Sequence, residues 1–352
     1  MTWSLFSLRS ARKGILGVMK TLPTPDFFDP TQVGEIWKVD YATRADQARD
    51  WAKQYDLKPA SASSNRISLL LVDVQNTFCI PGFELFVGGR SGHGAVDDNV
   101  RLCEFIYRNL GNITSITATL DTHLSQQIFH PIFFVDKNGN HPAPYTMIQV
   151  EQLQREEWKF NSALAPRYDI TPEYGQQMIV HYAETLRRRG KYALTIWPYH
   201  AMLGGIGHAL VPAVEETVFF HSIARLSQPK FEVKGEHPFT EHYSAVGPDV
   251  TKGPKGETLG KHNDAFINEL KEVDVMVIAG QAKSHCVAWT ISDLLDDIRA
   301  ADPDLARRVY LLEDCTSPVV VPGADFTDQA DEAFEAFAQA GMKIIKSTDV
   351  LG

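Results

Sequence analysis

Short apolar runs alternate with amphipathic stretches along most of the chain, from Ile67 to its end. Runs rich in Val, Ile and Leu are typical of strands covered on both faces, whereas apolar residues spaced by three and four are typical of helices. The apolar runs predict strands at 67–74, 113–121, 216–222, 273–280, 308–314 and 342–347. The amphipathic stretches predict helices at 95–110, 263–273, 286–300 and 328–341. We therefore expect an α/β fold with a doubly wound, six-stranded, mainly parallel sheet.

The region before this pattern has no strand signal. Residues 1–65 mix Pro, Asp, Trp and Ser, and one amphipathic stretch predicts a helix at 46–55. We interpret 1–65 as an N-terminal extension to an α/β domain at 66–352.

A second departure interrupts the domain itself. The alternation stops at about 133–196, where one helix is predicted at 173–190. Segments this long inside a compact domain are usually lids, interfaces or mobile parts. Its aromatic residues are too numerous for a solvated loop: Tyr145, Trp158, Phe160, Tyr168 and Tyr174. We expect this insertion to cover the active site or to join the subunits of a homo-oligomer; a peripheral subdomain with its own small core is the alternative.

Composition narrows the class of protein. The 352 residues carry 34 Lys and Arg against 44 Asp and Glu, a net charge of −10, which argues against a nucleic-acid-binding face. The longest apolar runs are too short to cross a bilayer. Four cysteines are too few for a disulfide framework and suit a reducing compartment such as the cytoplasm. The first twenty residues are basic without an acidic residue, so an organellar transit peptide is the alternative to an ordered arm.

Polar residues gather where the predicted strands end, which is where open α/β sheets bind ligands. Asp73 ends the first strand, and Cys286 follows the strand at 273–280 and opens a helix. A helix start favours a thiolate by about 0.3–1 kcal/mol. This effect alone is too small to ionise the thiol at neutral pH, so a neighbouring cation is needed as well. Cys286 is thus the candidate nucleophile, and a small buried hydrophobe is the alternative. Cys103 and Cys315 fit that second interpretation, and Cys79 fits either.

A metal site is the second candidate. Asp121 and His123 form a D-x-H pair at a strand end, whose two-residue period points both side chains to one side. His200 supplies a third ligand, and His130 is close enough in sequence to join them. One carboxylate with two or three imidazoles suits one divalent zinc, iron or manganese ion. We interpret the remaining histidines as ordinary surface or core residues.

Five segments in order resemble the isochorismatase-like cysteine hydrolases, and most closely the nicotinamidases. They are VDVQNTF, ATLDTH, WPYH, FEVKGEHPFTEHYSAV and AGQAKSHCV, within about 67–347. The resemblance implies a catalytic triad of Asp73, Lys234 and Cys286. It also implies a metal held by Asp121, His123 and His200.

Further roles follow from the same resemblance. The backbone N–H groups of Ala282 and Cys286 would hold the oxyanion, next to a cis peptide between Gln281 and Ala282. Phe78, Trp197 and Tyr243 would bind the substrate. Four features depart from many nicotinamidases. Ser284 precedes His285 where those proteins have Asp, two extra residues separate Lys234 from Tyr243 and Ser244, His130 is offset by about one residue, and the insertion is large.

The expected activity is hydrolysis of a small-molecule amide, nicotinamide or a close heteroaromatic amide, to the acid and ammonia through a cysteine thioester. One alternative is a related hydrolase of a carbamoyl, ureido or maleamate-type C–N bond. Another is a catalytically silent member in which the insertion and the N-terminal extension serve binding.

Overall fold

The computed structural model describes residues 20–321 and 323–351. The basic segment interpreted as a transit peptide or an ordered arm lies almost entirely outside these residues.

A six-stranded sheet forms the centre of the molecule, with the strand order β12-β9-β8-β1-β2-β7. All of its pairs are parallel. The strands are β1 (Ile67–Val72), β2 (Ser115–Asp121), β7 (Lys230–Lys234), β8 (Val275–Gly280), β9 (Val309–Leu312) and β12 (Lys343–Ile345). β1 and β8 are buried along their whole length, as their apolar runs predict.

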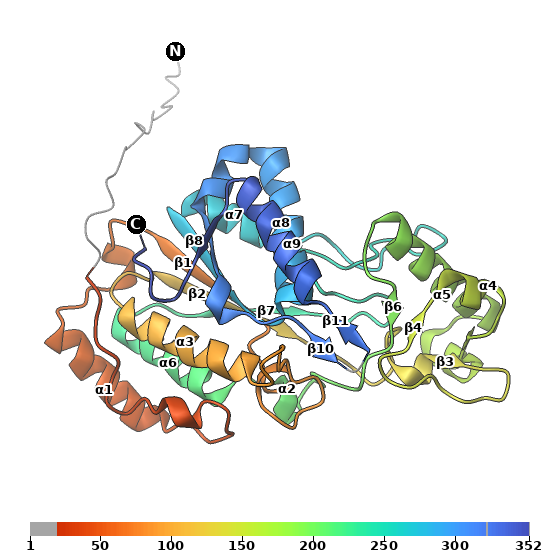
Figure 1. Cartoon of the computed structure of the whole chain (residues 1–352), viewed down its shortest axis with the longest axis horizontal. Coiled ribbons are helices and arrows are strands. Elements are labelled where there is room, and N and C mark those ends of the chain that lie inside the picture. Colours follow the sequence, from red (N-terminus) through yellow and green to blue (C-terminus); the bar gives the residue numbers. More distant parts are fainter. Residues whose placement is uncertain (1–19, 322, 352) are drawn as a thin grey trace, which may run out of the picture.

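Helices cover both faces of the sheet (Figure 1). On one face lie α1 (Tyr41–Gln54), α3 (Gly94–Arg108) and α6 (Pro212–Arg225), packed in one hydrophobic cluster. On the other lie α7 (Ala265–Glu272), α8 (Ala288–Ala301) and α9 (Thr327–Gln339), packed in a second. The expectation of a doubly wound α/β fold is therefore confirmed, and every helix predicted in the domain is present.

One predicted strand is wrong. Residues 216–222 lie inside α6, whose buried side chains recur at helical spacing. Pro212 begins this helix and Leu226, with a φ of 48°, ends it. The sixth strand is instead β7, which pairs with β2 at the edge of the sheet. Its sequence, KFEVK, alternates charged and apolar residues and lacks the continuous apolar run of a central strand.

The insertion folds into small elements at one end of the molecule (Figure 1). They are β3 (Phe134–Val135), β4 (Met147–Ile148), α4 (Val150–Gln154), β5 (Lys159–Phe160), α5 (Pro172–Arg188) and β6 (Leu194–Thr195). β3 pairs with β5 and β4 with β6. A third hydrophobic cluster holds them together and includes Phe239, Val250 and Leu259 from outside the insertion. The segment thus has a core of its own that is continuous with the domain.

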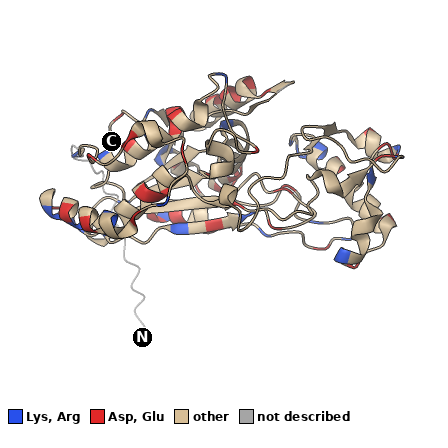
Figure 2. Ribbon diagram, turned by 90° about the horizontal axis from the view of Figure 1, so that it is seen from below, with Lys and Arg blue, Asp and Glu red and all other residues tan. Residues whose placement is uncertain are grey.

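The remaining α-helix and strands are short: α2 (Asn76–Cys79), and β10 (Val320–Val321) paired with β11 (Ala324–Asp325). Figure 2 shows acidic and basic residues interspersed along the outer helices. Within the described ranges, none of the helices has the length and apolar character that crossing a membrane requires.

Candidate active site

Asp73 lies directly after β1, with a φ of 47° that turns the chain sharply. Thr119 on the neighbouring β2 fixes its orientation. The Asp73 backbone N–H donates to Thr119 Oγ1 at 3.0 Å, and this hydroxyl donates to Asp73 Oδ1 at 2.5 Å. Burial raises the pKa of Asp73, although Lys234 opposes the shift. The second carboxylate oxygen remains available to the rest of the site.

Lys234, the last residue of β7, joins the polar groups of the site. Its Nζ lies 2.9 Å from Asp73 Oδ2, 2.8 Å from Asp121 Oδ1 and 3.6 Å from Cys286 Sγ. Only 4% of the residue is exposed. Burial alone would lower the pKa of Lys234, but Asp121 and Asp73 raise it well above its ordinary value. The ammonium is therefore a fixed positive charge between two carboxylates and a thiol.

Cys286 lies in a π-helical turn, Lys283–Val287, between β8 and α8. Burial raises its pKa well above the ordinary value, and this effect outweighs the neighbouring Lys234. Asp73 accepts a hydrogen bond from the thiol, which also favours the protonated form. In the substrate-free site, the loss of hydration therefore opposes the thiolate that a helix start favours.

The turn before Cys286 carries the predicted cis peptide. The bond between Gln281 and Ala282 is cis. The Gln281 side chain donates to Asp98 Oδ2 at 2.8 Å and accepts from the Ser317 N–H at 3.3 Å, which fixes the turn from both sides. Among the described residues, the Ala282 N–H donates to no acceptor. It is available for a ligand in the pocket that Ala282 and Cys286 both line.

Asp121, His123 and His200 form a buried group in which one ligand atom from each lies within 4.8 Å of the others. His123 Nδ1 lies 3.3 Å from the Gly235 carbonyl and His200 Nδ1 lies 2.8 Å from the Pro198 carbonyl. A proton on each Nδ1 leaves each Nε2 as an acceptor.

These acceptor nitrogens face a carboxylate. The two Nε2 atoms lie 2.8 Å and 3.6 Å from Asp121 Oδ2. Burial lowers the pKa of His123, so its ring stays neutral, and its Nε2 is buried without a hydrogen-bond donor. Acceptors that converge in this way, each imidazole held by a carbonyl behind it, fit a divalent cation.

His130 lies beside this group but outside it. Its ring centre is 6.0 Å from that of His123 and 6.2 Å from that of His200. Burial lowers the pKa of His130 to about 2, so the ring is neutral. The structure therefore brings three of the four predicted ligands together.

The pocket above these groups has aromatic and apolar walls. Phe78, Trp197 and Tyr243 line it, as the resemblance implies, and Trp197 Nε1 donates to Tyr243 Oη at 2.8 Å. Tyr145 of the insertion packs edge-on against Trp197, with ring centres 6.1 Å apart. The insertion thus supports one wall of the pocket. The other apolar lining residues are Leu85, Val87 and Val319.

Three residues of the site were not recognised in the sequence. Glu241 and His285 line the pocket, and burial raises the pKa of Glu241 well above its ordinary value. Gln75 hydrogen-bonds to the backbone of Asp121 twice. Its side chain accepts from the Asp121 N–H and donates to the Asp121 carbonyl, both at 2.8 Å. The position of Gln75, two residues after Asp73 at the end of a predicted strand, could have indicated that it belongs to the site. Glu241 lies in a loop, and the sequence does not reveal the path of that loop.

The other cysteines are free and buried. Burial raises the pKa of Cys103 to about 12 and that of Cys79 and Cys315 above their ordinary values. Cys79 therefore joins Cys103 and Cys315 as a packing residue.

The sequence matches no family model and no curated protein. Solved structures are similar to it at low sequence identity. A nicotinamidase/pyrazinamidase of Acinetobacter baumannii is 20% identical over 82% of this chain and 100% of that chain, with a TM-score of 0.48. The yeast nicotinamidase bound to nicotinaldehyde is 18% identical over 80% and 99%, with a TM-score of 0.49.

An N-carbamoylsarcosine amidase of Thermoplasma acidophilum is 13% identical over 82% of this chain and 99% of that chain, with a TM-score of 0.39. The structures to which the chain is similar thus include proteins of the kind that its motifs resemble.

Proposed function

We propose that the protein is a metal-dependent cysteine amidase that hydrolyses nicotinamide, or a close heteroaromatic amide, to the acid and ammonia. One observation carries this proposal: Lys234 Nζ lies within 3.6 Å of Cys286 Sγ and 2.9 Å of Asp73, beneath a pocket with aromatic walls. A nucleophile, a base and a fixed cation in contact are the parts that acyl transfer requires.

Asp73 acts first as the base. Because the thiol and the carboxylate are adjacent and both pKa values are raised by burial, the proton moves from sulfur to Asp73 as sulfur attacks the amide carbonyl. Lys234 stabilises the negative charge during this transfer. Asp73 then gives the proton to the departing nitrogen, the C–N bond breaks, and ammonia leaves a thioester on Cys286.

Water completes the cycle. Asp73, again a carboxylate, removes a proton from a water molecule that attacks the thioester, and the thiol and the acid are released. In both steps the carbonyl oxygen becomes an oxyanion. The unpaired Ala282 N–H and the Cys286 N–H would donate to it, a contribution of roughly 3–4 kcal/mol per donor in known cases.

The heteroaromatic preference follows from the walls and the metal group. Phe78 and Trp197 offer apolar faces to a planar ring. A divalent ion held by Asp121, His123 and His200 would supply a Lewis-acid position for a ring nitrogen. Asp121 also contacts Lys234. The residues that would position the substrate ring are therefore connected to those that would act on the substrate carbonyl.

Ammonia release from a substrate panel tests the proposal. The panel contains nicotinamide, pyrazinamide, benzamide, maleamate and a ureido compound. We expect nicotinamide or pyrazinamide to be hydrolysed at least tenfold more efficiently than benzamide, which has the same ring shape without the nitrogen. Efficient hydrolysis of maleamate or the ureido compound alone would identify the related C–N hydrolase, and no hydrolysis of any amide would indicate a silent member.

A further inference from the structure

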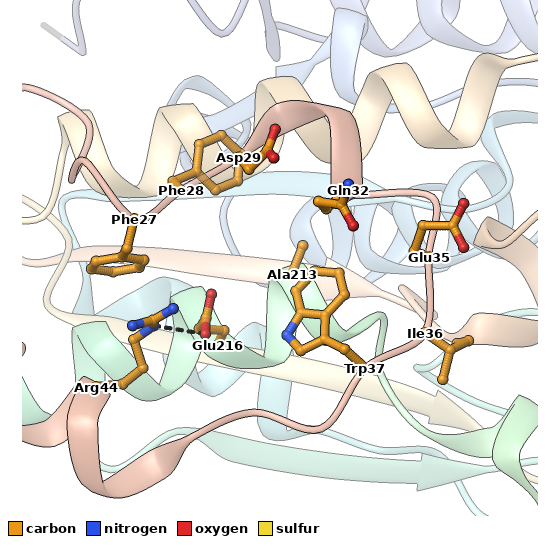
Figure 3. Close-up of a pocket in the computed structure, with 10 residues that line it drawn as sticks. All are labelled: Phe27, Phe28, Asp29, Gln32, Glu35, Ile36, Trp37, Arg44, Ala213 and Glu216. Carbon is orange, nitrogen blue, oxygen red and sulfur yellow. Dashed lines mark hydrogen bonds and ion pairs between the residues drawn. The ribbon is translucent and has the colours of Figure 1, made fainter.

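A second cavity lies where the N-terminal extension crosses the first turns of α6 (Figure 3). Its volume is about 240 Å³. Phe27, Phe28 and Trp37 supply aromatic walls, and Asp29, Glu35 and Glu216 supply carboxylates. It lies on the face of the sheet that carries α1, α3 and α6, and its lining includes none of the active-site residues described above.

Glu216 is the buried polar group of this cavity. Only 6% of the residue is exposed, and its Oε1 accepts from Arg44 Nε at 2.7 Å. No hydrogen bond from the described part of the chain reaches its Oε2. Figure 3 shows this oxygen pointing away from Arg44, into the space between Phe27 and Trp37. Glu216 Oε2 is therefore free to accept a hydrogen bond from a ligand that enters the cavity.

The charges at the cavity favour a cation over an anion. Asp29, Glu35 and Glu216 against Arg44 leave a formal charge of −2. The guanidinium of Arg44 is already engaged: besides Glu216, it donates to Gln47 at 2.8 Å and lies 3.9 Å above the ring of Phe27. An anion would therefore be repelled by the carboxylates, and Arg44 already has other partners, so the cavity disfavours anions.

We propose that this cavity binds a small organic cation with a planar aromatic body. Its ammonium group donates to Glu216 Oε2, which gives a charge-assisted hydrogen bond in a partly desolvated place. Its ring packs against Trp37, whose π face also attracts the positive charge, because Arg44 already covers one face of Phe27. This binding site is independent of the amidase activity proposed above.

Calorimetry on the full-length protein tests the charge requirement. The probes are 2-phenylethylammonium, 2-phenylethanol and phenylacetate, which share a ring and differ in charge. We expect the ammonium compound to bind at least tenfold more tightly than the other two. Equal affinities for the ammonium compound and the alcohol, or no binding of the ammonium compound at millimolar concentration, would overturn the proposal.

Matched variants locate the site. Glu216→Gln removes the buried charge, whereas Glu215→Gln removes a charge from the neighbouring residue, which binds the Tyr41 hydroxyl and does not line the cavity. We expect the preference for the ammonium compound to fall at least tenfold in the first variant and less than threefold in the second. Equal effects of both changes would place the probe elsewhere.

If Glu216→Gln does not fold, the Trp37→Leu variant tests whether the probe binds in this cavity. Trp37 is half-buried at the cavity wall, so its replacement removes an aromatic face without breaking an ion pair. We expect at least tenfold weaker binding of 2-phenylethylammonium, with the thermal unfolding temperature within a few degrees of wild type. Unchanged affinity in Trp37→Leu would contradict the proposal.

Discussion

At the scale of single residues, Asp121 connects the two halves of the site. Its Oδ1 contacts Lys234 at 2.8 Å, and its Oδ2 lies 2.8 Å from His123 Nε2. Asp121 therefore connects the proposed metal group to the Lys234 of the proposed triad. Burial alone would raise the pKa of Asp121, but the Lys234 ammonium helps to hold it well below its usual range. The carboxylate is thus ionised whenever the site is intact.

Lys234→Met tests the fixed cation. The change leaves two buried carboxylates without their partner, so we expect kcat to fall at least a thousandfold and the free energy of unfolding to fall by about 3–5 kcal/mol. Steady-state kinetics and urea unfolding measure the two effects. Lys230→Met, on the exposed end of the same strand, is the control. Similar losses in both variants would show that β7 matters only as a strand.

His200→Ala tests the metal group. We expect metal content after purification without chelator to fall at least tenfold, because one of three ligands is lost, and KM to rise more than kcat falls. Elemental analysis and kinetics measure these quantities. His262→Ala, at an exposed histidine that contacts Asp297, should change neither. Wild-type protein that is fully active without any metal would refute this role.

At the scale of elements, the sequence predicted the central strands and the edge strand β12, but it missed the other edge strand, β7. β1, β2 and β8 are central and buried, so their apolar runs are unambiguous, and they led directly to Asp73, Asp121 and Cys286. β7 is an edge strand in which Phe231 and Val233 are exposed. Because charged residues alternate with these apolar ones, its sequence lacks the apolar run by which the central strands were predicted. Lys234 was consequently found only through the resemblance. Glu241 and His285 depend on loop paths and side-chain packing that no local pattern encodes.

The insertion provides the next prediction. Tyr145 supports Trp197 from behind, so Tyr145→Ala should loosen one pocket wall and raise KM about three- to tenfold with little change in kcat. Tyr174→Ala is the matched control, because Tyr174 packs in the same cluster but contacts Lys255, away from the pocket. Kinetics with nicotinamide measure both. Identical KM values in the two variants would show that the insertion is peripheral to binding.

At the scale of the whole molecule, two additions flank one α/β domain. The N-terminal extension packs on α6 through pairs such as Trp51 and Phe220, whose ring centres are 6.3 Å apart. The insertion lies at another end and shares its core with loops of the domain (Figure 1).

Buried histidines make the stability of the fold sensitive to acid. Burial lowers the pKa of His221 on α6 to about 4, against about 6.5 in an unfolded chain. Between these values the unfolded state binds a proton that the folded state does not, so the free energy of unfolding decreases as the pH falls from about 6.5 towards 4. Above about pH 7 the ring of His221 is neutral in both states, so this residue contributes no pH dependence to the free energy of unfolding.

The His221→Gln variant isolates this effect, because glutamine can still donate to the Ile113 carbonyl that His221 Nε2 contacts at 3.0 Å. From pH 7 to pH 5 we expect wild type to lose about 2 kcal/mol more than the variant. Urea unfolding at the two pH values measures the difference. Equal losses would show that His221 is protonated in the folded state at pH 5.

The central claim is that Cys286 attacks the amide carbon. Mass spectrometry of peptides from protein quenched in acid during nicotinamide turnover tests this most directly. The account predicts a nicotinoyl group on Cys286, none on the buried Cys79, and no detectable turnover by Cys286→Ala with its fold retained. Hydrolysis by Cys286→Ala at a rate close to wild type, with no acyl group on Cys286 in the wild-type protein, would contradict it.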